Sequence, residues 1–334
     1  MLILVSFLFS FQLLAKTHVA ACEVKNYQPA YLKLAWGKLT NKRSMERSPW
    51  PLPLLSIGHN MASYQNYGGG LDQAYFHHGL DIRADKGTPI HAAKGGKVVN
   101  AANYNGGNSL YWEVAILDDN GFIWQYHHID SSSIPDAVKK AFKAGGRVST
   151  GDLLGEVVSW PITSYGERYH HIHLNILDKD KAYVNPFHFL DVLPDTKAPM
   201  ILDIGFVRKN KIVAGDHITG AYNLYLHTQD LILHDKFFVP PYEISYRINQ
   251  GETVTVWKFD NLPGGAVEEK FVNDFFIPNL TCGDYSCRKM YINLGFTVNG
   301  NRNFPQTKGV YDLEVTVKDV VGNQDIKIFH FNVD

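Results

Sequence analysis

The sequence predicts a mostly β protein made of two consecutive β domains. From residue 50 to residue 194, short apolar runs alternate with glycine-rich turns, as in GTPIHAAKGGKVVNAANYNGGN. The chain ends in a strand-turn-strand pattern, and the stretch LPDTKAPM at 193–200 has two prolines and no apolar rhythm, as a linker does. Such spacing favours antiparallel sheets over alternating βαβ units. A length of 334 residues is enough for two domains of ordinary size.

Composition and charge argue against two classes of protein. Hydrophobic residues make up 45% of the chain and charged residues 19%, so each domain can bury a core and extensive disorder is not expected. Lys and Arg number 32 against 33 Asp and Glu, which leaves no basic excess for binding nucleic acid. Of the 15 histidines, seven fall in three short clusters. We therefore expect the chemistry at those clusters.

Residues 1–21 are expected to be a secretory signal peptide. Residues 2–15 form a continuous apolar run, which is short for a membrane span but suits the central region of an export signal, although no Lys or Arg precedes it. A membrane anchor or a buried helix is the alternative. Small residues directly before Cys22 permit cleavage there. We therefore expect a protein exported to the periplasm, the cell envelope or the medium, with no membrane span after processing.

The three cysteines have different expected roles. Cys22 follows Val-Ala-Ala, which loosely resembles a bacterial lipoprotein box, but the polar residues 16–18 separate it from the apolar run. Lipidation at Cys22 is therefore an alternative to simple cleavage, which we favour. Residues 22–49 form a polar N-terminal lead-in without a clear pattern. Cys282 and Cys287 enclose the short sequence GDYS, a loop that a disulfide can close in an oxidising compartment.

One helix is expected in the first domain, over IPDAVKKAFK. Ser132 or Ser133 can cap it, Pro135 suits the first helical position, and Gly145 with Gly146 ends it.

The second domain, residues 195–334, is expected to be a β-sandwich. Its end reads YDLEVTV, KDVVGNQ and IKIFHFNV, a hairpin with Gly322 and Asn323 in the turn. This hairpin resembles the last two strands of bacterial immunoglobulin-like domains, which often carry a D-x-x-G-N turn. The resemblance implies an adhesion module or a module that docks on the cell wall or on a protein. A packing spacer is the alternative.

The stretch YHHIHLNI at 169–176 places three histidines in a strand-like segment. Side chains two positions apart share a face of a strand, so we expect His171 and His173 to point one way and His170 the other. Neutral imidazole is a preferred zinc ligand, and a His-x-His pair on a strand can chelate. Alone, such a pair is more often an ordinary polar face.

A carboxylate and a further histidine come from FHHGLDIRADKGTPIHAA. His77 and Asp81 are of equal parity in an extended segment, and Gly79 lies between them. Two histidines and a carboxylate leave the fourth position of zinc open, as in catalytic sites. His78 has the opposite parity and is expected to flank the site, and a surface or core role is expected for His91.

The third cluster is WQYHHID. Alternation places Tyr126 and His128 on one face and His127 on the other. A histidine near a zinc-bound water can act as a general base or stabilise an oxyanion. Taken alone, His128 is expected to be structural.

Together these passages resemble the lysostaphin-type zinc metallopeptidases, a family of peptidoglycan endopeptidases with a small antiparallel β domain and a groove. The resemblance covers about residues 50–192. The H-x-G-x-D motif with its I-x-A-x-x-G-T-P run fits residues 77–89, and Y-x-H-L fits residues 126–129. V-x-x-G-x-x-x-G fits residues 148–155, and H-L-H-F fits residues 171–174. All four agree in order and spacing.

The resemblance implies that His77, Asp81 and His173 bind one zinc ion, and that His128 and His171 are catalytic. Which of these two is the base stays open. Two departures concern the surroundings: Asn175 stands where the family commonly has Glu, and SIGHNMASYQNYGGGLDQAYF replaces the usual S-x-F-G-x-R approach.

The expected function is a zinc endopeptidase that hydrolyses peptide bonds of peptidoglycan stem peptides or cross-bridges, with these peptides as partners. A non-catalytic wall-binding or activator protein and an adhesion module are the alternatives.

Overall fold

The computed structural model describes residues 46–53, 56–68, 73–234, 236–262, 272–297 and 300–334. The expected signal peptide, Cys22 and most of the lead-in lie outside the described residues. Within the described residues, no helix is both long and apolar enough to cross a membrane.

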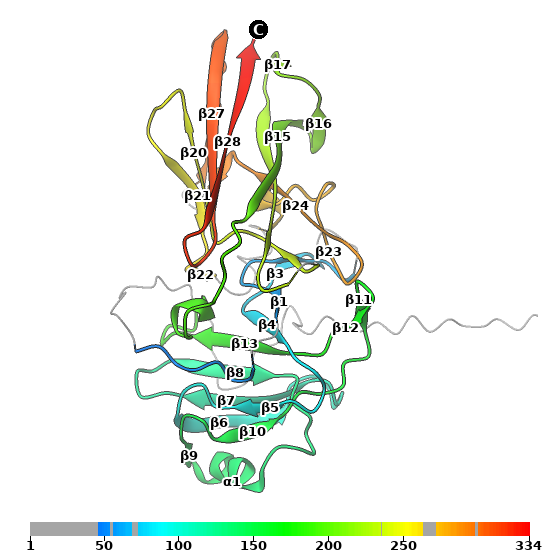
Figure 1. Ribbon diagram of the computed structural model, residues 1–334, viewed down its shortest axis with the longest axis vertical. Coiled ribbons are helices and arrows are strands. Elements are labelled where there is room, and N and C mark those ends of the chain that lie inside the picture. Colours follow the sequence, from blue (N-terminus) through cyan, green and yellow to red (C-terminus); the bar gives the residue numbers. More distant parts are fainter. Residues whose placement is uncertain (1–45, 54–55, 69–72, 235, 263–271, 298–299) are drawn as a thin grey trace, which may run out of the picture.

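Two groups of sheets follow one another along the long axis of the molecule (Figure 1). The first group consists mainly of strands up to residue 184, and the second of strands from residue 200 onward. The prediction of a mostly β fold with an antiparallel first half is confirmed.

The first group is built on a nine-stranded antiparallel sheet. Its order is β1-β4-β13-β8-β7-β6-β9, with β14 beside β13 and β22 beside β14. Its strands are β1 (Ser56–His59), β4 (Leu80–Arg83), β6 (Gly96–Asn103), β7 (Trp112–Leu117), β8 (Ile123–His127), β9 (Arg147–Val148), β13 (His171–Leu177), β14 (Tyr183–Val184) and β22 (Asn261–Leu262).

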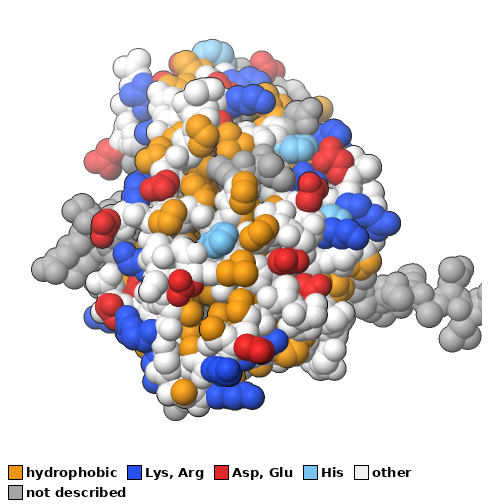
Figure 2. Space-filling view, turned by 60° about the horizontal axis from the view of Figure 1, so that its bottom comes forward, with side chains coloured by type: hydrophobic (Ala, Val, Ile, Leu, Met, Phe, Trp, Pro, Cys, Tyr) orange, Lys and Arg blue, Asp and Glu red, His pale blue; other side chains and the backbone are white. Residues whose placement is uncertain are grey.

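Shorter elements surround this sheet. Three two-stranded ribbons pair β2 (Tyr64–Gln65) with β3 (Tyr75–Phe76), β5 (Pro89–His91) with β10 (Leu153–Glu156), and β11 (Thr163–Ser164) with β12 (Glu167–Arg168). Among the described residues, the helix α1 (Asp136–Ala144) and the 3-10 helix η2 (Pro186–His188) also belong to this group. On the face with α1 turned forward, basic and acidic side chains are interspersed (Figure 2), as the balanced composition leads one to expect.

The expected helix is present, but its start differs from the prediction. Gly145 ends α1 in the left-handed conformation, at φ 67°, as predicted. Pro135 is the N-cap, and no side chain caps the helix. The Ser133 hydroxyl is used elsewhere, since it donates to the Asp130 carbonyl and accepts from the Glu156 amide. The prediction of a serine cap was therefore wrong.

The second group contains two larger sheets and a ribbon. One sheet has the order β16-β15-β18-β24-β23 with β19 beside β18, and the other has the order β17-β28-β27-β20-β21. Their strands are β15 (Met200–Arg208), β16 (Lys211–Val213), β17 (His217–Ile218), β18 (Asn223–Leu231), β19 (Phe238–Val239), β20 (Glu243–Ile248), β21 (Val254–Lys258), β23 (Cys282–Gly283), β24 (Arg288–Asn293), β27 (Gly309–Lys318) and β28 (Gln324–Val333), and the ribbon pairs β25 (Phe296–Thr297) with β26 (Gly300–Asn301).

The predicted C-terminal hairpin is formed by β27 and β28, which pair antiparallel from Gly309↔Val333 to Lys318↔Gln324. Gly322 lies in its turn at φ 101°, a conformation that glycine adopts without strain. Phe331 of β28 packs against Phe206 of β15, with ring centroids 5.5 Å apart. The core of this half therefore lies between its two sheets.

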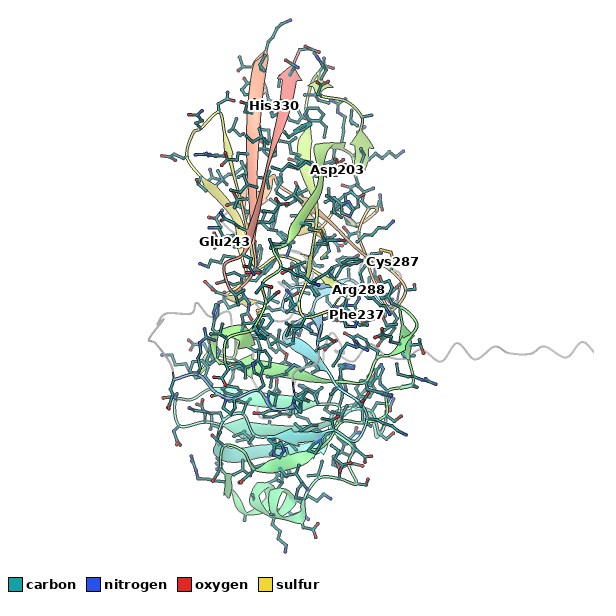
Figure 3. The ribbon with its side chains drawn as sticks, viewed as in Figure 1. Asp203, Phe237, Glu243, Cys287, Arg288 and His330 are labelled. Atoms are coloured by element: carbon teal, nitrogen blue, oxygen red, sulfur yellow. A yellow bond between two sulfur atoms is a disulfide. The ribbon has the colours of Figure 1, made fainter. Side chains whose placement is uncertain are left out.

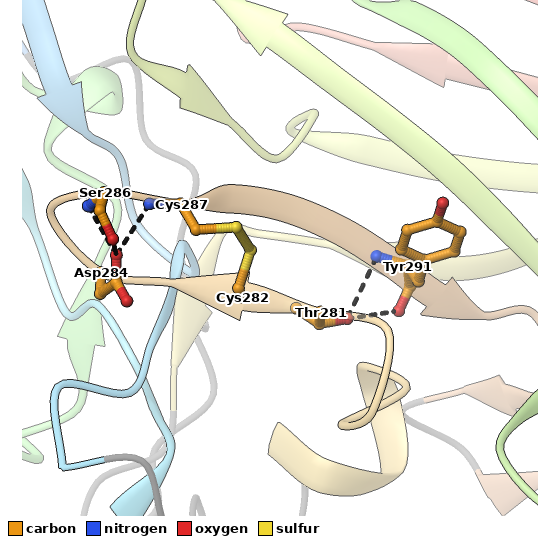
Figure 4. The surroundings of a disulfide bond; sticks show 6 residues. All are labelled: Thr281, Cys282, Asp284, Ser286, Cys287 and Tyr291. Carbon is orange, nitrogen blue, oxygen red and sulfur yellow. Dashed lines mark hydrogen bonds between the residues drawn. A yellow bond between two sulfur atoms is a disulfide. The ribbon is translucent and has the colours of Figure 1, made fainter. Parts of the chain in front are cut away.

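The predicted disulfide joins Cys282 and Cys287 (Figure 4). The Asp284 carboxylate accepts hydrogen bonds from the backbone amides of Ser286 and Cys287, so the loop is also held by its own side chain. The bond closes the turn between β23 and β24.

The two halves share a continuous apolar core. Phe76 of β3 lies 5.9 Å from Trp257 and 6.0 Å from Phe275, measured between ring centroids. The Asn60 amide donates to the Pro240 carbonyl at 2.9 Å, and β14 pairs with β22. Residues of the second half therefore reach the region beside the histidine clusters.

Candidate metal centre

Strand β13 separates the core from the site. All seven of its residues are buried. Ile172, Leu174 and Ile176 belong to the apolar core of the first half. Because faces alternate along a strand, His171, His173 and Asn175 share the opposite face.

Neighbouring segments bring two further groups to that face. His173 pairs directly with Asp81 of β4, so the two side chains lie side by side. His77 reaches them through Gly79, where an added Cβ would lie 2.1 Å from the Leu174 carbonyl oxygen. Glycine therefore permits the close approach of this turn to β13.

Three atoms that can serve as metal ligands converge at one point. His77 Nε2 lies 2.9 Å from Asp81 Oδ1, and His173 Nδ1 lies 3.0 Å from the same oxygen. The two imidazole nitrogens are 2.9 Å apart. All three residues are buried and form a group able to hold a metal ion.

Hydrogen bonds on the far side of the His77 ring fix its protonation. Its Nδ1 lies 3.0 Å from the Asn60 carbonyl oxygen and 3.1 Å from that of Gly79. Carbonyl oxygens only accept, so Nδ1 carries the proton. The lone pair of Nε2 therefore faces Asp81.

A chain of buried side chains fixes the protonation of His173. Its Nε2 lies 2.7 Å from Asn175 Oδ1, the Asn175 amide donates to Gln125 Oε1 at 3.5 Å, and the Gln125 amide donates to Glu113 Oε2 at 3.1 Å. The two Glu113 oxygens accept from the side-chain amides of Asn100 and Gln125, which sets the direction of the amides along this chain. His173 therefore donates from Nε2 and presents the lone pair of Nδ1.

The three facing atoms are thus all acceptors, with no proton between them. Three lone pairs this close repel each other unless a cation lies among them. Ligands about 2.0–2.1 Å from a tetrahedral zinc ion lie about 3.3 Å apart, close to the separations found here. The donor set therefore fits zinc.

His128 and His171 lie next to this centre. The Nδ1 atom of His128 is 2.8 Å from the Leu110 carbonyl oxygen, and the Nδ1 atom of His171 is 2.8 Å from that of Tyr169. Each ring thus carries its proton on Nδ1 and presents Nε2 as an acceptor. His171 Nε2 is 3.8 Å from Asp81 Oδ1.

The Nε2 atom of His128 is an orphaned polar atom. It is buried and, within the described part of the chain, has no hydrogen-bond partner. Burial, with a smaller contribution from His171, lowers the pKa of His128 to about 3. The ring is therefore neutral at physiological pH and presents the lone pair of Nε2.

The expected alternation at WQYHHID was wrong. His127, not Tyr126, lies opposite His173 across β8 and β13, and its ring is 5.4 Å from that of His173. Tyr126 points into the core, where its hydroxyl oxygen accepts a hydrogen bond from the Ala93 backbone amide at 2.9 Å. His128 follows the end of β8 at φ 65°, and this turn brings it to the same side as His127. Both members of the pair therefore lie beside the centre.

The other histidines of the clusters lie away from the metal ligands. His78 stacks on Tyr183 with ring centroids 4.2 Å apart, and His170 Nδ1 accepts from the Trp160 backbone amide at 2.9 Å. His91 is exposed, and its Nδ1 lies 3.0 Å from the Gly151 carbonyl oxygen. These placements agree with the flanking and surface roles expected for them.

Several supporting residues were not found from the sequence. Glu113 of β7 is fully buried, and Gln125 of β8 is nearly so. The available signal was the single acidic residue inside the apolar run LYWEVAIL. In the sequence, Asn175 stands out only as a departure from the family pattern, and no pattern marks Tyr169.

The centre is closed to solvent. His77, Asp81, His128, His171 and His173 are each at most 3% exposed. An aromatic cluster lies beside it and includes Tyr111, Trp160, Tyr169 and Phe237. A peptide can therefore contact these five residues only when neighbouring segments move.

Comparison with known proteins agrees with this geometry. Residues 75–186 match the model of peptidase family M23. Over 82 residues, 24% of this chain, the sequence is 33% identical to the glycyl-glycine endopeptidase ALE-1 of Staphylococcus capitis. The match spans only 19% of that protein's length.

Similar solved structures include Csd3 of Helicobacter pylori, with 24% identity, coverage of 44% of this chain and 35% of that chain, and a TM-score of 0.33. A putative M23 peptidase of Pseudomonas aeruginosa has 25% identity, coverage of 44% and 55%, and a TM-score of 0.26. At these TM-scores, the interpretation of the site does not depend on either structure.

Proposed function

Because residues 75–186 form a domain of peptidase family M23, with His77, Asp81 and His173 as its zinc-binding triad, we propose that the protein is an exported endopeptidase. Its proposed substrates are the peptides of bacterial peptidoglycan, either stem peptides or cross-bridges. The glycyl-glycine endopeptidase named above supports this substrate class.

One observation carries the proposal. Three acceptor atoms, from segments far apart in the chain, face one another without a proton between them. Beside them, two imidazoles present Nε2 atoms that are not needed for the metal. A purely structural zinc site needs no such additional bases.

The residues divide the chemistry between them. Zinc held by the triad supplies a Lewis acid for the scissile carbonyl and lowers the pKa of water. His128 and His171 are each held by a backbone carbonyl, so each can take up a proton at Nε2 or, once protonated, donate a hydrogen bond from it. We propose that one accepts the proton of the attacking water and the other stabilises the developing oxyanion.

The remaining parts of the chain are assigned by their sequence. We propose residues 1–21 as a signal peptide, 22–49 as the lead-in, 50–194 as the peptidase domain and 195–334 as an immunoglobulin-like β-sandwich that docks on the wall or on a protein. The hairpin of β27 and β28 supports the last assignment. After removal of the signal, the protein is proposed to act outside the cytoplasm.

The test is digestion of purified peptidoglycan by the full chain, followed by mass spectrometry of the released muropeptides. Zinc-loaded protein should release new peptide ends, chelator-treated protein should release none, and added zinc should restore the release. His78→Ala is the matched control. His78 is the sequence neighbour of the metal ligand His77, but its ring stacks on Tyr183. Absence of cleavage by zinc-loaded protein on every wall type tested would refute the proposal.

The closed state of the centre favours a second candidate, a non-catalytic wall-binding or activator protein. Five buried site residues are expected if the centre never admits substrate. The same digestion separates the candidates: an activator binds the wall and releases no peptide by itself, but increases release by a separate hydrolase.

A further inference from the structure

The two oxygens of Asp81 have different partners. Oδ1 faces His77 and His173 at 2.9 and 3.0 Å. Oδ2 accepts a hydrogen bond from the Tyr169 hydroxyl at 2.9 Å. One oxygen is thus directed to the metal position and the other is occupied by a donor.

Tyr169 is the donor of this hydrogen bond. Its side chain is almost completely buried. A carboxylate oxygen accepts and the phenolic O–H donates, so the hydroxyl directs its proton at Oδ2.

The position of Tyr169 depends on a glycine. A Cβ added to Gly58 would lie 2.1 Å from the Tyr169 hydroxyl oxygen. Only a residue without a side chain therefore leaves room for this hydroxyl between β1 and Asp81.

Residues of the second half of the chain contact both Gly58 and Tyr169. Arg288 of β24 donates a hydrogen bond to the Gly58 carbonyl, and its guanidinium lies 5.5 Å from the centroid of the Tyr169 ring. The Phe237 ring packs against Tyr169 with centroids 5.6 Å apart. Figure 3 shows Arg288 and Phe237 together where the two halves meet.

We propose that Tyr169 is a positioning residue for the metal ligand Asp81 and that the C-terminal half, through Arg288 and Phe237, holds it in place. A carboxylate with one oxygen occupied by a donor binds metal through the other oxygen alone. Fixing its rotation also removes an entropy cost from metal binding. The C-terminal half is thereby a structural part of the metal centre.

Metal affinity of the full chain tests the first step. Tyr169→Phe should weaken zinc binding about 10–100-fold, the usual cost of losing a hydrogen bond to a metal ligand. Tyr225→Phe is the control: it removes the same kind of bond, from the Tyr225 hydroxyl to the Asp203 carboxylate, and Asp203 is not a metal ligand. Affinity is measured by competition with a chromophoric chelator.

A spectroscopic readout separates positioning from general support. Cobalt(II) can replace zinc as a spectroscopic probe. In Tyr169→Phe, the Oδ2 atom of Asp81 has lost its hydrogen bond and can also bind the cobalt ion. The visible absorption bands of cobalt(II) should then weaken, because the coordination number rises. Wild-type affinity together with a wild-type cobalt spectrum in Tyr169→Phe would overturn the proposal.

Two further variants test how Tyr169 is held. Gly58→Ala leaves the hydroxyl in place chemically but displaces it, so it should reproduce the loss of Tyr169→Phe. Arg288→Gln should weaken zinc binding in the wild-type background and have no further effect in Tyr169→Phe. Equal effects of Arg288→Gln in both backgrounds would show that Arg288 does not act through Tyr169. Thermal unfolding of the metal-free variants identifies any that fail to fold.

The inference rests on the metal centre of the proposed function, but its measurement needs no substrate. A protein that fails to cleave peptidoglycan can still show the predicted losses of zinc affinity. Conversely, an active protein with unchanged affinity in Tyr169→Phe would leave the proposed function intact and remove only this inference.

Discussion

The imidazole rings of His128 and His171 lie 4.8 Å apart, measured between centroids, and each is fixed through Nδ1 to a backbone carbonyl. His171 is on a regular strand, whereas His128 follows a strand end in a left-handed conformation. Two different backbone geometries thus present equivalent nitrogens beside Asp81.

The pair predicts a separation of metal binding from catalysis. His128→Ala and His171→Ala should each retain zinc and lose about 10²–10⁴-fold in turnover, the usual contribution of a general acid or base. Elemental analysis and a peptide cleavage assay on the same preparations check this. Wild-type turnover in either zinc-loaded variant would remove that histidine from the mechanism.

Asn175 should contribute to zinc affinity through His173. Asn175→Ala removes the acceptor of the His173 Nε2 proton and should weaken zinc binding about 10–100-fold. Asn175→Asp keeps an acceptor there and should bind more tightly than Asn175→Ala. Chelator competition measures both, and equal affinities for the two variants would contradict the prediction.

His128 should make stability depend on pH. Its folded pKa, about 3, lies below the ordinary value of 6.5, so the unfolded chain binds a proton first as the pH falls. The contribution of the neutral His128 ring to the free energy of unfolding is fully present above pH 6.5. It is lost as the pH falls from about 6.5 to 3, by up to about 1.4 kcal/mol per pH unit. Denaturant unfolding of metal-free protein should therefore show a steeper loss for the wild type than for His128→Asn. The same pH dependence of the unfolding free energy in both proteins would contradict the prediction.

Asp230 should have the opposite effect. Burial, with smaller contributions from Asp319 and Asp195, raises its pKa from 3.8 to about 8. The stability linked to its proton is present below pH 3.8 and is lost as the pH rises toward 8. Asp230→Asn should therefore gain stability relative to the wild type from pH 4 to pH 8. Asp216→Asn, at an exposed carboxylate, is the control, and a constant difference between Asp230→Asn and the wild type would refute the prediction.

The Cys282–Cys287 disulfide should contribute about 2 kcal/mol to the free energy of unfolding, because it closes a short loop. The double variant Cys282→Ser, Cys287→Ser should unfold at correspondingly lower denaturant concentration. The bonds to Asp284 pre-order the loop, so a smaller loss is compatible with this account, whereas a gain in stability is not.

Local sequence patterns were sufficient where neighbours along the chain decide the structure. Alternation along β13 predicted that His171 and His173 share a face, and Gly145 predicted the end of α1. Alternation failed at His127 and His128, because it assumes an extended backbone and His128 is not extended. The start of α1 was misplaced because Ser133 bonds across a turn rather than to the helix.

The sequence by itself determined the fold class and the chemical identity of the metal ligands, since residue type, order and strand periodicity are local properties. Only the tertiary structure decided what surrounds them. Glu113 orients His173 through two amides, and Arg288 reaches Tyr169 from the other half of the chain. These contacts depend on strand register and on the packing of one half against the other, which arise from the burial of apolar surface across the whole molecule and leave no periodic trace in the chain.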